Sequence, residues 1–340
     1  MHTGVQVSPP LTARPATPRD TPTRRRQIKG GDVYKYILRR LLQMIPVLLG
    51  STFIIFAMVF ALPGDPTAGM CGERPCAPAF VAKFRAEHNL NDPLPTRYAK
   101  YMGNLAQGDL GTTFRDVKVS QELEQRYPTT AKLAGMAVLF ETIIGVIAGV
   151  LAGIRKGKFM DNLVLVSTLM VIAIPIFVIG ATLQYYLGVR AKLFPVTVSP
   201  EATFYELLLP AFVLGSASIA YVARLTRTNL VENLRADYLR TAIAKGLTRQ
   251  RAIGLHALRN SLIPVVTFIG ADFGGLLGGA IVTERIFNIQ GVGGYLFTGI
   301  RNRDGVSVVG TVTVLVLVFL LVNLLVDLAY GVLDPRISHD

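Results

Sequence analysis

Long apolar runs alternate with shorter polar stretches along the chain. Six runs are about 20 residues long, the length that a helix needs to cross a ~30 Å hydrocarbon core. Each run is continuous, whereas strands of a membrane barrel would appear as short segments of alternating polarity. Helices are therefore expected, because a helix satisfies its own backbone hydrogen bonds in lipid. The expected spans are residues 41–62, 131–154, 162–189, 207–223, 261–282 and 307–332.

The composition fits this pattern. Hydrophobic residues make up 51% of the 340 residues and charged residues only 17%, against about 25% charged residues in ordinary soluble domains. The predicted fold class is all-α, a polytopic membrane protein with one transmembrane domain over residues 34–336. Residues 1–33 are rich in Pro, Thr and Arg, and this composition predicts a disordered tail.

The net charge of +13 is unevenly distributed. Lys and Arg exceed acidic residues in 1–40, 155–161 and 224–260, whereas 63–130 and 190–206 are balanced. Such alternation follows the positive-inside rule and predicts cytoplasmic N- and C-termini. Basic charge also suits nucleic acid, but the alternation favours membrane topology. We therefore expect contact with lipid and no nucleic-acid partner.

The longest segment outside the expected spans is residues 63–130, which we interpret as an outer cap. Phe80–His88 has helical spacing, Asn91–Pro93 is a turn signal, and Thr96 is expected to cap a second helix. This cap either shields span ends or forms a docking surface for an external partner. Both interpretations remain open.

The chain has two cysteines, Cys71 and Cys76, both in the outer cap. An oxidising compartment would permit a disulfide between them. The alternative is two free thiols, and we expect no metal site because His88 is the one histidine nearby.

Three ionisable residues lie inside the expected spans: Glu141, Asp272 and Asp327. A charge at the bilayer centre costs roughly 2.5–3.5 kcal/mol on insertion scales, so each should face the bundle interior or an aqueous cavity. They either line a path for hydrophilic cargo or form hydrogen bonds between helices. Gln184 and Asn323 are further candidates for the translocation path.

No motif for nucleotide or metal chemistry was found. Gly157–Lys158 is followed by Phe159 and has Ala152 where a phosphate-binding loop would begin with glycine. The four histidines are scattered, without metal-ligand spacing. We therefore expect no enzyme activity and no cofactor in this chain, and any transport energy must come from a gradient or a partner.

The most organised polar stretch is residues 224–260, between the fourth and fifth spans. A helix is expected from about Val231 to Lys245, Gly246 can close it in the left-handed conformation, and Thr248 can cap the next. Pro264 is expected to let the fifth span start in a new direction. The resulting corner suits docking into a groove of another protein or lying on anionic lipid.

Residues 236–266 resemble the cytoplasmic coupling loop of ABC importer permease subunits in the dipeptide/oligopeptide/nickel branch. Arg240–Ala242 occupies the start of the family's Glu-Ala-Ala signature, and Gly246 its glycine. Leu258–Arg259 stands where the general signature has Leu-Pro. Four shorter segments also match in the family's order: LPGDP (62–66), GDLGTTF (108–114), TERIFNIQGVGG (283–294) and LDPR (333–336).

The resemblance implies a type I ABC importer permease fold in a bacterial inner membrane. It implies a second homologous permease subunit, two cytoplasmic ABC ATPase subunits that bind ATP and Mg, and an extracytoplasmic solute-binding protein. The residues that it implies for ATPase coupling are Arg240, Thr241, Ala242, Gly246, Leu258 and Arg259.

Peptides are the expected cargo, with nickel chelates, glutathione and haem as alternatives within the same class. Two other classes remain. A secondary transporter would use an ion gradient and show inverted repeats and broken helices, and a membrane scaffold would recruit a cytoplasmic partner without a polar path.

Overall fold

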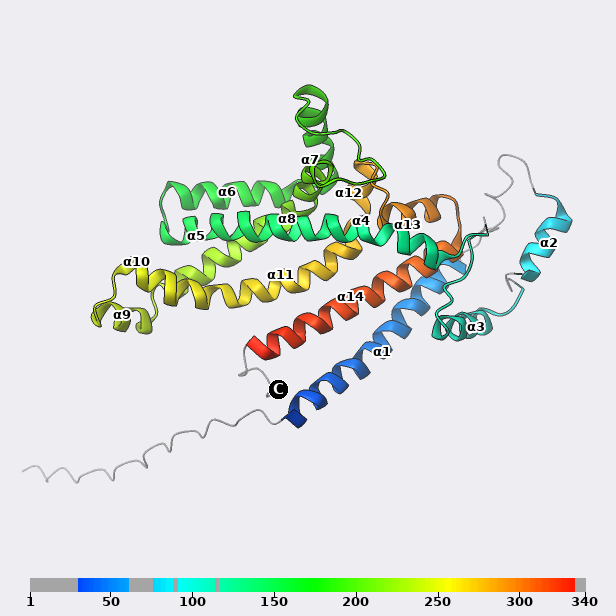
Figure 1. Ribbon diagram of the computed structural model, residues 1–340, viewed down its shortest axis with the longest axis horizontal. Coiled ribbons are helices and arrows are strands. Elements are labelled where there is room, and N and C mark those ends of the chain that lie inside the picture. Colours follow the sequence, from blue (N-terminus) through cyan, green and yellow to red (C-terminus); the bar gives the residue numbers. More distant parts are fainter. Residues whose placement is uncertain (1–29, 61–75, 88–90, 114–115, 334–340) are drawn as a thin grey trace, which may run out of the picture.

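The computed structural model describes residues 30–60, 76–87, 91–113 and 116–333. This part of the chain is helical apart from one isolated β-bridge between Thr112 and Lys118. The prediction of an all-α membrane protein is confirmed. The long helices run along one common direction, and short helices gather at the two ends (Figure 1).

Five continuous helices are long and apolar enough to cross a membrane. Two of them contain a π-helical stretch and are therefore divided into three labelled segments each. The five are α1 (Gly30–Phe60); α4 (Val119–Phe140) with η1 (Glu141–Gly145) and α5 (Val146–Ile154); α8 (Phe204–Asn233); α10 (Arg249–Ala252) with η3 (Ile253–Leu258) and α11 (Arg259–Gly279); and α14 (Gly305–Leu333).

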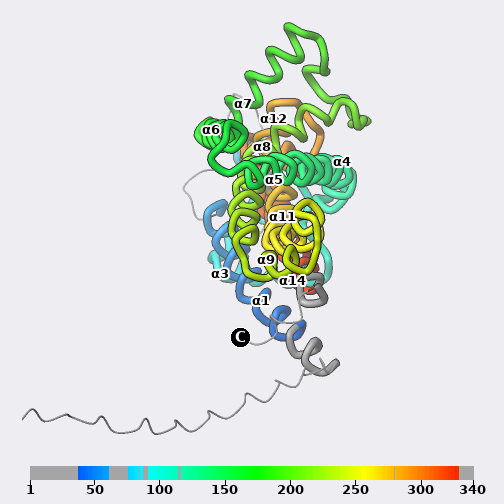
Figure 2. The backbone as a smooth tube through the Cα atoms, turned by 90° about the vertical axis from the view of Figure 1, so that its left-hand side faces the viewer, coloured from blue at the N-terminus to red at the C-terminus, as the bar shows by residue number. Residues whose placement is uncertain are grey.

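The sixth expected span, residues 162–189, is broken rather than continuous. Helix α6 (Phe159–Ala173) is followed by α7 (Ile176–Leu183) and η2 (Gln184–Arg190), and the two halves meet at 102°. Pro175 explains the break, because it lacks an N–H and disfavours helical backbone at the preceding residue. Ile174 is accordingly extended, with φ −93° and ψ 127°. Figure 2 shows α7 rising away from the bundle.

The remaining helices are short: α2 (Pro78–Glu87), α3 (Leu94–Ala106), α9 (Asp237–Ala244), α12 (Ile281–Ile286) and α13 (Val292–Arg301). The expected turn at Asn91–Pro93 precedes α3. Thr96 does not cap that helix, because α3 already begins at Leu94, directly after Pro93.

Two expectations for the stretch between the fourth and fifth spans were wrong. No single helix runs from Val231 to Lys245, because α8 ends at Asn233 and a turn separates it from α9. Pro264 also does not start a new direction. It lies inside the continuous helix that begins at Arg249.

Helix α8 is the centre of the packing and contacts α4, α5, α6, α7, α11 and α12. Its first turn is fixed by a capping box between Thr203 and Glu206. Glycines on η1 and α5 permit a very close approach: a Cβ at Gly149 would lie 2.5 Å from the carbonyl oxygen of Ala223. Small residues at such spacing let helix backbones pack tightly in lipid.

Helices α1, α11 and α14 pack beside this core. A Cβ at Gly270 would lie 2.7 Å from Val326 Cγ1, so this glycine also serves close packing. Helix α9 and the α5–α6 turn lie at one end of the bundle, and α3 and α13 at the other (Figure 1).

Candidate functional site

The end of the bundle with α9 carries a sharp corner at Gly246. This residue has φ +95°, the left-handed conformation that its position predicted. Two backbone hydrogen bonds close the corner: Gly246 N–H to the Ile243 carbonyl at 2.9 Å and Leu247 N–H to the Ala242 carbonyl at 3.2 Å. Thr248 stands at the N-cap position of α10, but its hydroxyl makes no capping bond.

The inner face of the corner is fixed to the bundle. Leu239 is buried with Leu230, Ala252 and Ala257 in a small apolar cluster. The Asn233 amide adds a polar link, because it donates to Ser261 Oγ at 3.1 Å while its oxygen accepts from the Tyr238 hydroxyl at 2.6 Å. The corner is therefore packed against and hydrogen-bonded to α8 and the helix that contains α11.

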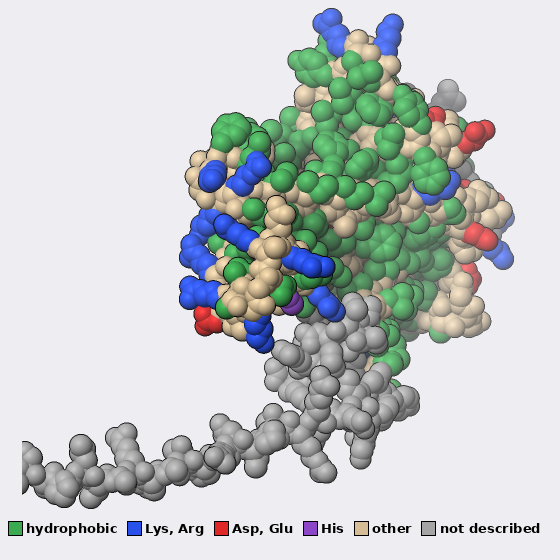
Figure 3. All heavy atoms as spheres, turned by 60° about the vertical axis from the view of Figure 1, so that its left-hand side comes forward, with side chains coloured by type: hydrophobic (Ala, Val, Ile, Leu, Met, Phe, Trp, Pro, Cys, Tyr) green, Lys and Arg blue, Asp and Glu red, His purple; other side chains and the backbone are tan. Residues whose placement is uncertain are grey.

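The outer face of the corner is basic with apolar members. Arg240, Thr241 and Gly246 are exposed, and Ala242 is half-buried. We define the corner surface as these four residues plus the other exposed side chains of α9, its C-cap and the following helix as far as His256. Those are Asp237, Tyr238, Ile243, Ala244, Lys245, Arg249, Gln250, Arg251, Leu255 and His256, with cations outnumbering the one acid. Figure 3 shows Lys and Arg side chains gathered at this end.

The six predicted coupling residues do not share one place. Leu258 is half-buried and Arg259 exposed, but both lie on the following helix, about 14 Å along its axis from Arg249 at 1.5 Å per residue. The predicted coupling set does not include Tyr238, Ile243 and Leu255, whose side chains are exposed in the same stretch. Their apolar character within a basic stretch is the signal that could have indicated them.

The five predicted path residues fall in three separate places. Glu141 on η1 is fully buried and lies within electrostatic reach of Asp272 on α11 and Ser218 on α8. Within the described part of the chain, neither oxygen of Glu141 has a hydrogen-bond partner, nor does Oδ2 of Asp272. These two carboxyls are the pair that the fold brings together.

The other three candidates make different contacts. Asp327 pairs with Arg40 at 3.1 Å, and both line a polar cleft of about 320 Å³ with Asn323 between α1 and α14. The Gln184 amide donates to the carbonyls of Val196 (2.7 Å) and Ile286 (2.9 Å), which ties η2 to α12. These three residues therefore lie apart from the Glu141–Asp272 pair, and their part in a translocation path stays a prediction.

Of the predicted cysteine pair, Cys71 lies outside the described residues, so the disulfide stays a prediction. The same holds for most of the predicted tail, 1–29.

A buried carboxylate that the sequence analysis missed organises the opposite end. Glu284 is fully buried; it accepts from Thr130 Oγ1 at 2.7 Å and from Gly294 N–H at 2.7 Å. The same Thr130 oxygen accepts from Val292 N–H at 2.9 Å. Burial raises the pKa of Glu284, although these hydrogen bonds act in the opposite direction. We call Glu284, Thr130 and the N-terminus of α13 the carboxylate clamp.

The carboxylate clamp explains why two positions of the segment TERIFNIQGVGG, Gly291 and Gly293, are glycine. A Cβ at Gly291 would overlap the Glu284 carboxyl, and one at Gly293 would lie 2.7 Å from Ile281 Cα. An anion is also stabilised by the N–H groups and dipole at a helix N-terminus. The clamp therefore joins α4, α12 and α13 into one unit.

Comparisons with known proteins agree with this architecture. Residues 145–339 match the family described as binding-protein-dependent transport system inner membrane component, and residues 33–134 match its N-terminal family model. The chain belongs to this family. It is the membrane-spanning permease subunit of an ABC importer.

The permease resembles curated relatives over nearly its whole length. It is 38% identical over 335 residues to the dipeptide transport system permease protein of Escherichia coli K12, covering 90% of this chain and 99% of that protein. It is 37% identical over 331 residues to the di/tripeptide transport system permease protein of Pseudomonas aeruginosa (89% and 98%). It is 35% identical over 305 residues to the glutathione transport system permease protein of Pectobacterium atrosepticum (89% and 99%).

Family membership fixes three general properties. The permease is a multi-pass inner-membrane protein, it serves transport rather than catalysis, and it works with a binding protein and ATPase subunits.

Proposed function

We propose that the permease forms half of the translocation pathway of an ATP-driven importer of di- and oligopeptides. A second homologous permease supplies the other half, and a solute-binding protein delivers the cargo. Two cytoplasmic ATPase subunits bind ATP and Mg. Relatives named for dipeptide and di/tripeptide transport, aligned over about nine-tenths of the chain, support the peptide cargo.

The corner at Gly246 carries the proposal for coupling. Its surface combines apolar anchors with several cations and projects from one end of the bundle, which suits a groove on an ATPase subunit. Closure of the ATPase pair would then tilt α8 and α11, to which the corner is fixed. The excess of basic residues at this end supports cytoplasmic termini.

The Glu141–Asp272 pair is the proposed polar element of the path. Among the described residues, three carboxyl oxygens of this pair have no hydrogen-bond partner, and such buried carboxyls are costly at membrane depth. Such groups typically mark routes for polar cargo rather than inert packing.

The coupling role can be tested with a matched pair of glycines. Gly246 needs its positive φ and has no atom within 4 Å of an added Cβ, and Gly254 has the same open space without positive φ. We expect Gly246→Ala to lower stimulation of ATPase activity by peptide-loaded binding protein in the reconstituted complex. Gly254→Ala should match the parent complex. Normal stimulation in Gly246→Ala would refute the coupling role.

The cargo requires a separate measurement. Reconstituted complex should take up a labelled dipeptide in an ATP-dependent manner, and excess unlabelled dipeptide should compete. Glutathione is the second candidate because of the relative from Pectobacterium. Uptake of glutathione with no uptake of dipeptides would overturn the peptide proposal and leave the importer class intact.

A further inference from the structure

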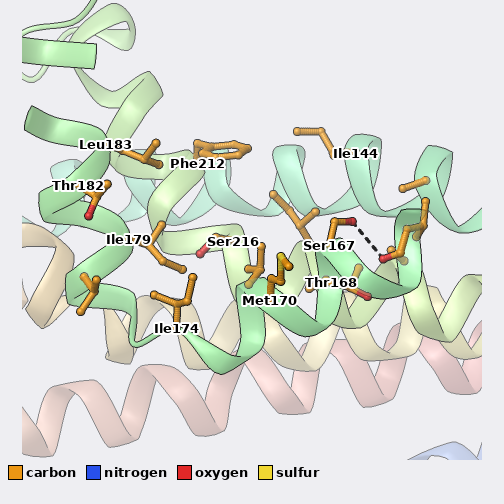
Figure 4. A pocket seen from close by; sticks show the side chains of 17 residues that line it. Ile144, Ser167, Thr168, Met170, Ile174, Ile179, Thr182, Leu183, Phe212 and Ser216 are labelled. Carbon is orange, nitrogen blue, oxygen red and sulfur yellow. Dashed lines mark hydrogen bonds between the residues drawn. The ribbon is translucent and has the colours of Figure 1, made fainter. Parts of the chain in front are cut away.

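An apolar cavity lies beneath the bend of the broken span. It has a volume of about 470 Å³, is open on one side, and is lined by η1, α5, α6, α7 and α8. Figure 4 shows Ile144, Met170, Ile179 and Phe212 among the side chains around it. The cavity exists because Pro175 turns α7 away from the line of α6.

Three of the four hydroxyl side chains in the cavity lining, all except Thr182, donate to carbonyl groups of the protein. Ser167 donates to the Val164 carbonyl at 3.1 Å, Thr168 to the Leu165 carbonyl at 3.0 Å, and Ser216 to the Val213 carbonyl at 2.8 Å. Each bond lies within the residue's own helix, so these hydroxyls are not left in need of a partner. The remaining lining is almost entirely hydrocarbon. An apolar occupant therefore fits the cavity, and a peptide backbone does not.

The cavity has the depth of one membrane leaflet. Along α6 its lining extends from Val164 to Ile174, about 15 Å at 1.5 Å per residue. This length is half of a ~30 Å hydrocarbon core.

Basic residues lie before the start of α6, about 9 Å along the helix axis from the first lining residue of that helix, Val164, at 1.5 Å per residue. The turn between α5 and α6 carries Arg155, Lys156 and Lys158, all exposed, and α6 begins at Phe159. The nearby acidic residue, Asp161, does not neutralise these exposed cations, because it is buried and paired with another arginine. Asp161 is only 2% exposed, because Arg227 donates to both of its oxygens at 2.7 and 2.9 Å.

From these observations we infer that an anionic phospholipid occupies this groove. Its phosphate contacts the basic α5–α6 turn, and one acyl chain fills the cavity beneath the bend. Cationic side chains at a helix end attract anionic headgroups, and basic pockets between membrane helices bind them. The lipid then supplies the packing that the broken span lacks. This inference does not depend on the cargo.

Photocrosslinking in the reconstituted complex tests the inference. Complexes are prepared in phosphatidylcholine vesicles that contain a small amount of a photoactivatable lipid with a diazirine at the end of its acyl chain. In one preparation this lipid is phosphatidylglycerol, and in the other it is phosphatidylcholine. Labelled residues are mapped by mass spectrometry. We expect phosphatidylglycerol to label residues 164–179 about fivefold more than phosphatidylcholine does. This ratio corresponds to the attraction between an anionic headgroup and one Lys or Arg side chain. Exposed apolar residues of α1, such as Phe53 and Ile54, should show a ratio near one.

Charge variants provide the control. Lys156→Gln/Lys158→Gln should bring the ratio at 164–179 down to that of α1. Lys118→Gln/Lys192→Gln removes the same charge from exposed positions elsewhere and should leave the ratio unchanged. Copurification of the partner subunits reports whether each variant still assembles. Equal labelling by the two lipids would overturn the inference. So would absence of labelling by either lipid, which would mean that a partner subunit covers the groove.

Discussion

Glycine serves opposite purposes at the two ends of the permease. At the corner, Gly246 has φ +95° and open space around it. In the carboxylate clamp, Gly291 has extended backbone that any residue can adopt, yet an added Cβ would overlap Glu284. The first glycine is required for its backbone and the second for its missing side chain. One end is thus built to present a surface and the other to hold helices together.

Substitution at Gly291 should have the largest effect. Gly291→Ala forces a methyl group against a buried carboxylate that already accepts two described hydrogen bonds. We expect a loss of more than about 3 kcal/mol, from overpacking and displaced charged hydrogen bonds. Thermal unfolding of the purified complex measures it. A Gly291→Ala variant as stable as the parent would show that the Glu284 carboxyl can shift to make room for the methyl group at little cost.

Thr130 tests the clamp without adding volume. Thr130→Val removes the hydroxyl that donates to Glu284 and accepts from Val292, and should cost about 2–3 kcal/mol, since a charged group loses a donor. Thr130→Ser keeps the hydroxyl and should recover most of this loss. Thr168→Val is the matched control, because that buried hydroxyl bonds only within its own helix. Equal losses for Thr130→Val and Thr168→Val would contradict a special role for the clamp.

The corner should respond to backbone preference rather than size. Gly246→Ala should cost about 1–2 kcal/mol locally, the penalty of left-handed backbone for a residue with a Cβ. Gly246→Asn should cost less despite its larger side chain, because Asn tolerates this conformation. Binding-protein-stimulated ATPase activity should therefore rank Gly, then Asn, then Ala. A ranking by side-chain volume would show that the space around Gly246 is filled in the complex.

Arg240 should have the smallest effect on stability. Its contact with Asp237 is 3.5 Å long and both side chains are more than three-quarters exposed. Such pairs contribute little, so Arg240→Ala should change the unfolding free energy by less than about 0.5 kcal/mol. If Arg240→Ala lowers stimulated ATPase activity while stability stays the same, the loss comes from a contact between Arg240 and a partner subunit. Unchanged stability and unchanged stimulation together would remove Arg240 from the coupling surface.

Much of the fold could be predicted because hydrophobic length alone marks a membrane span. The left-handed conformation of Gly246 could also be predicted, because a lone glycine between two polar helical stretches indicates a helix C-cap. The bend at Pro175 was missed although its signal was present: proline in the middle of an apolar run breaks a helix as readily as it kinks one. Pro264 shows the converse, because a continuous helix accommodates it.

The site was harder to predict than the fold. Asp272 and Glu141 meet because η1 and α11 both pack on α8, and pairing across helices leaves no local trace in sequence. Glu284 was passed over because a single acidic residue near a predicted span end is usually solvated. Its burial depends on Thr130, 154 residues earlier in the chain.

The central position of α8 has a mechanical consequence. Its 30 residues form a rod about 45 Å long, anchored by the capping box at one end and continued into the corner at the other. A partner that displaced the corner would act directly on the end of this helix. Because α8 is continuous across the bundle, the displacement would reach the helices packed around its far end.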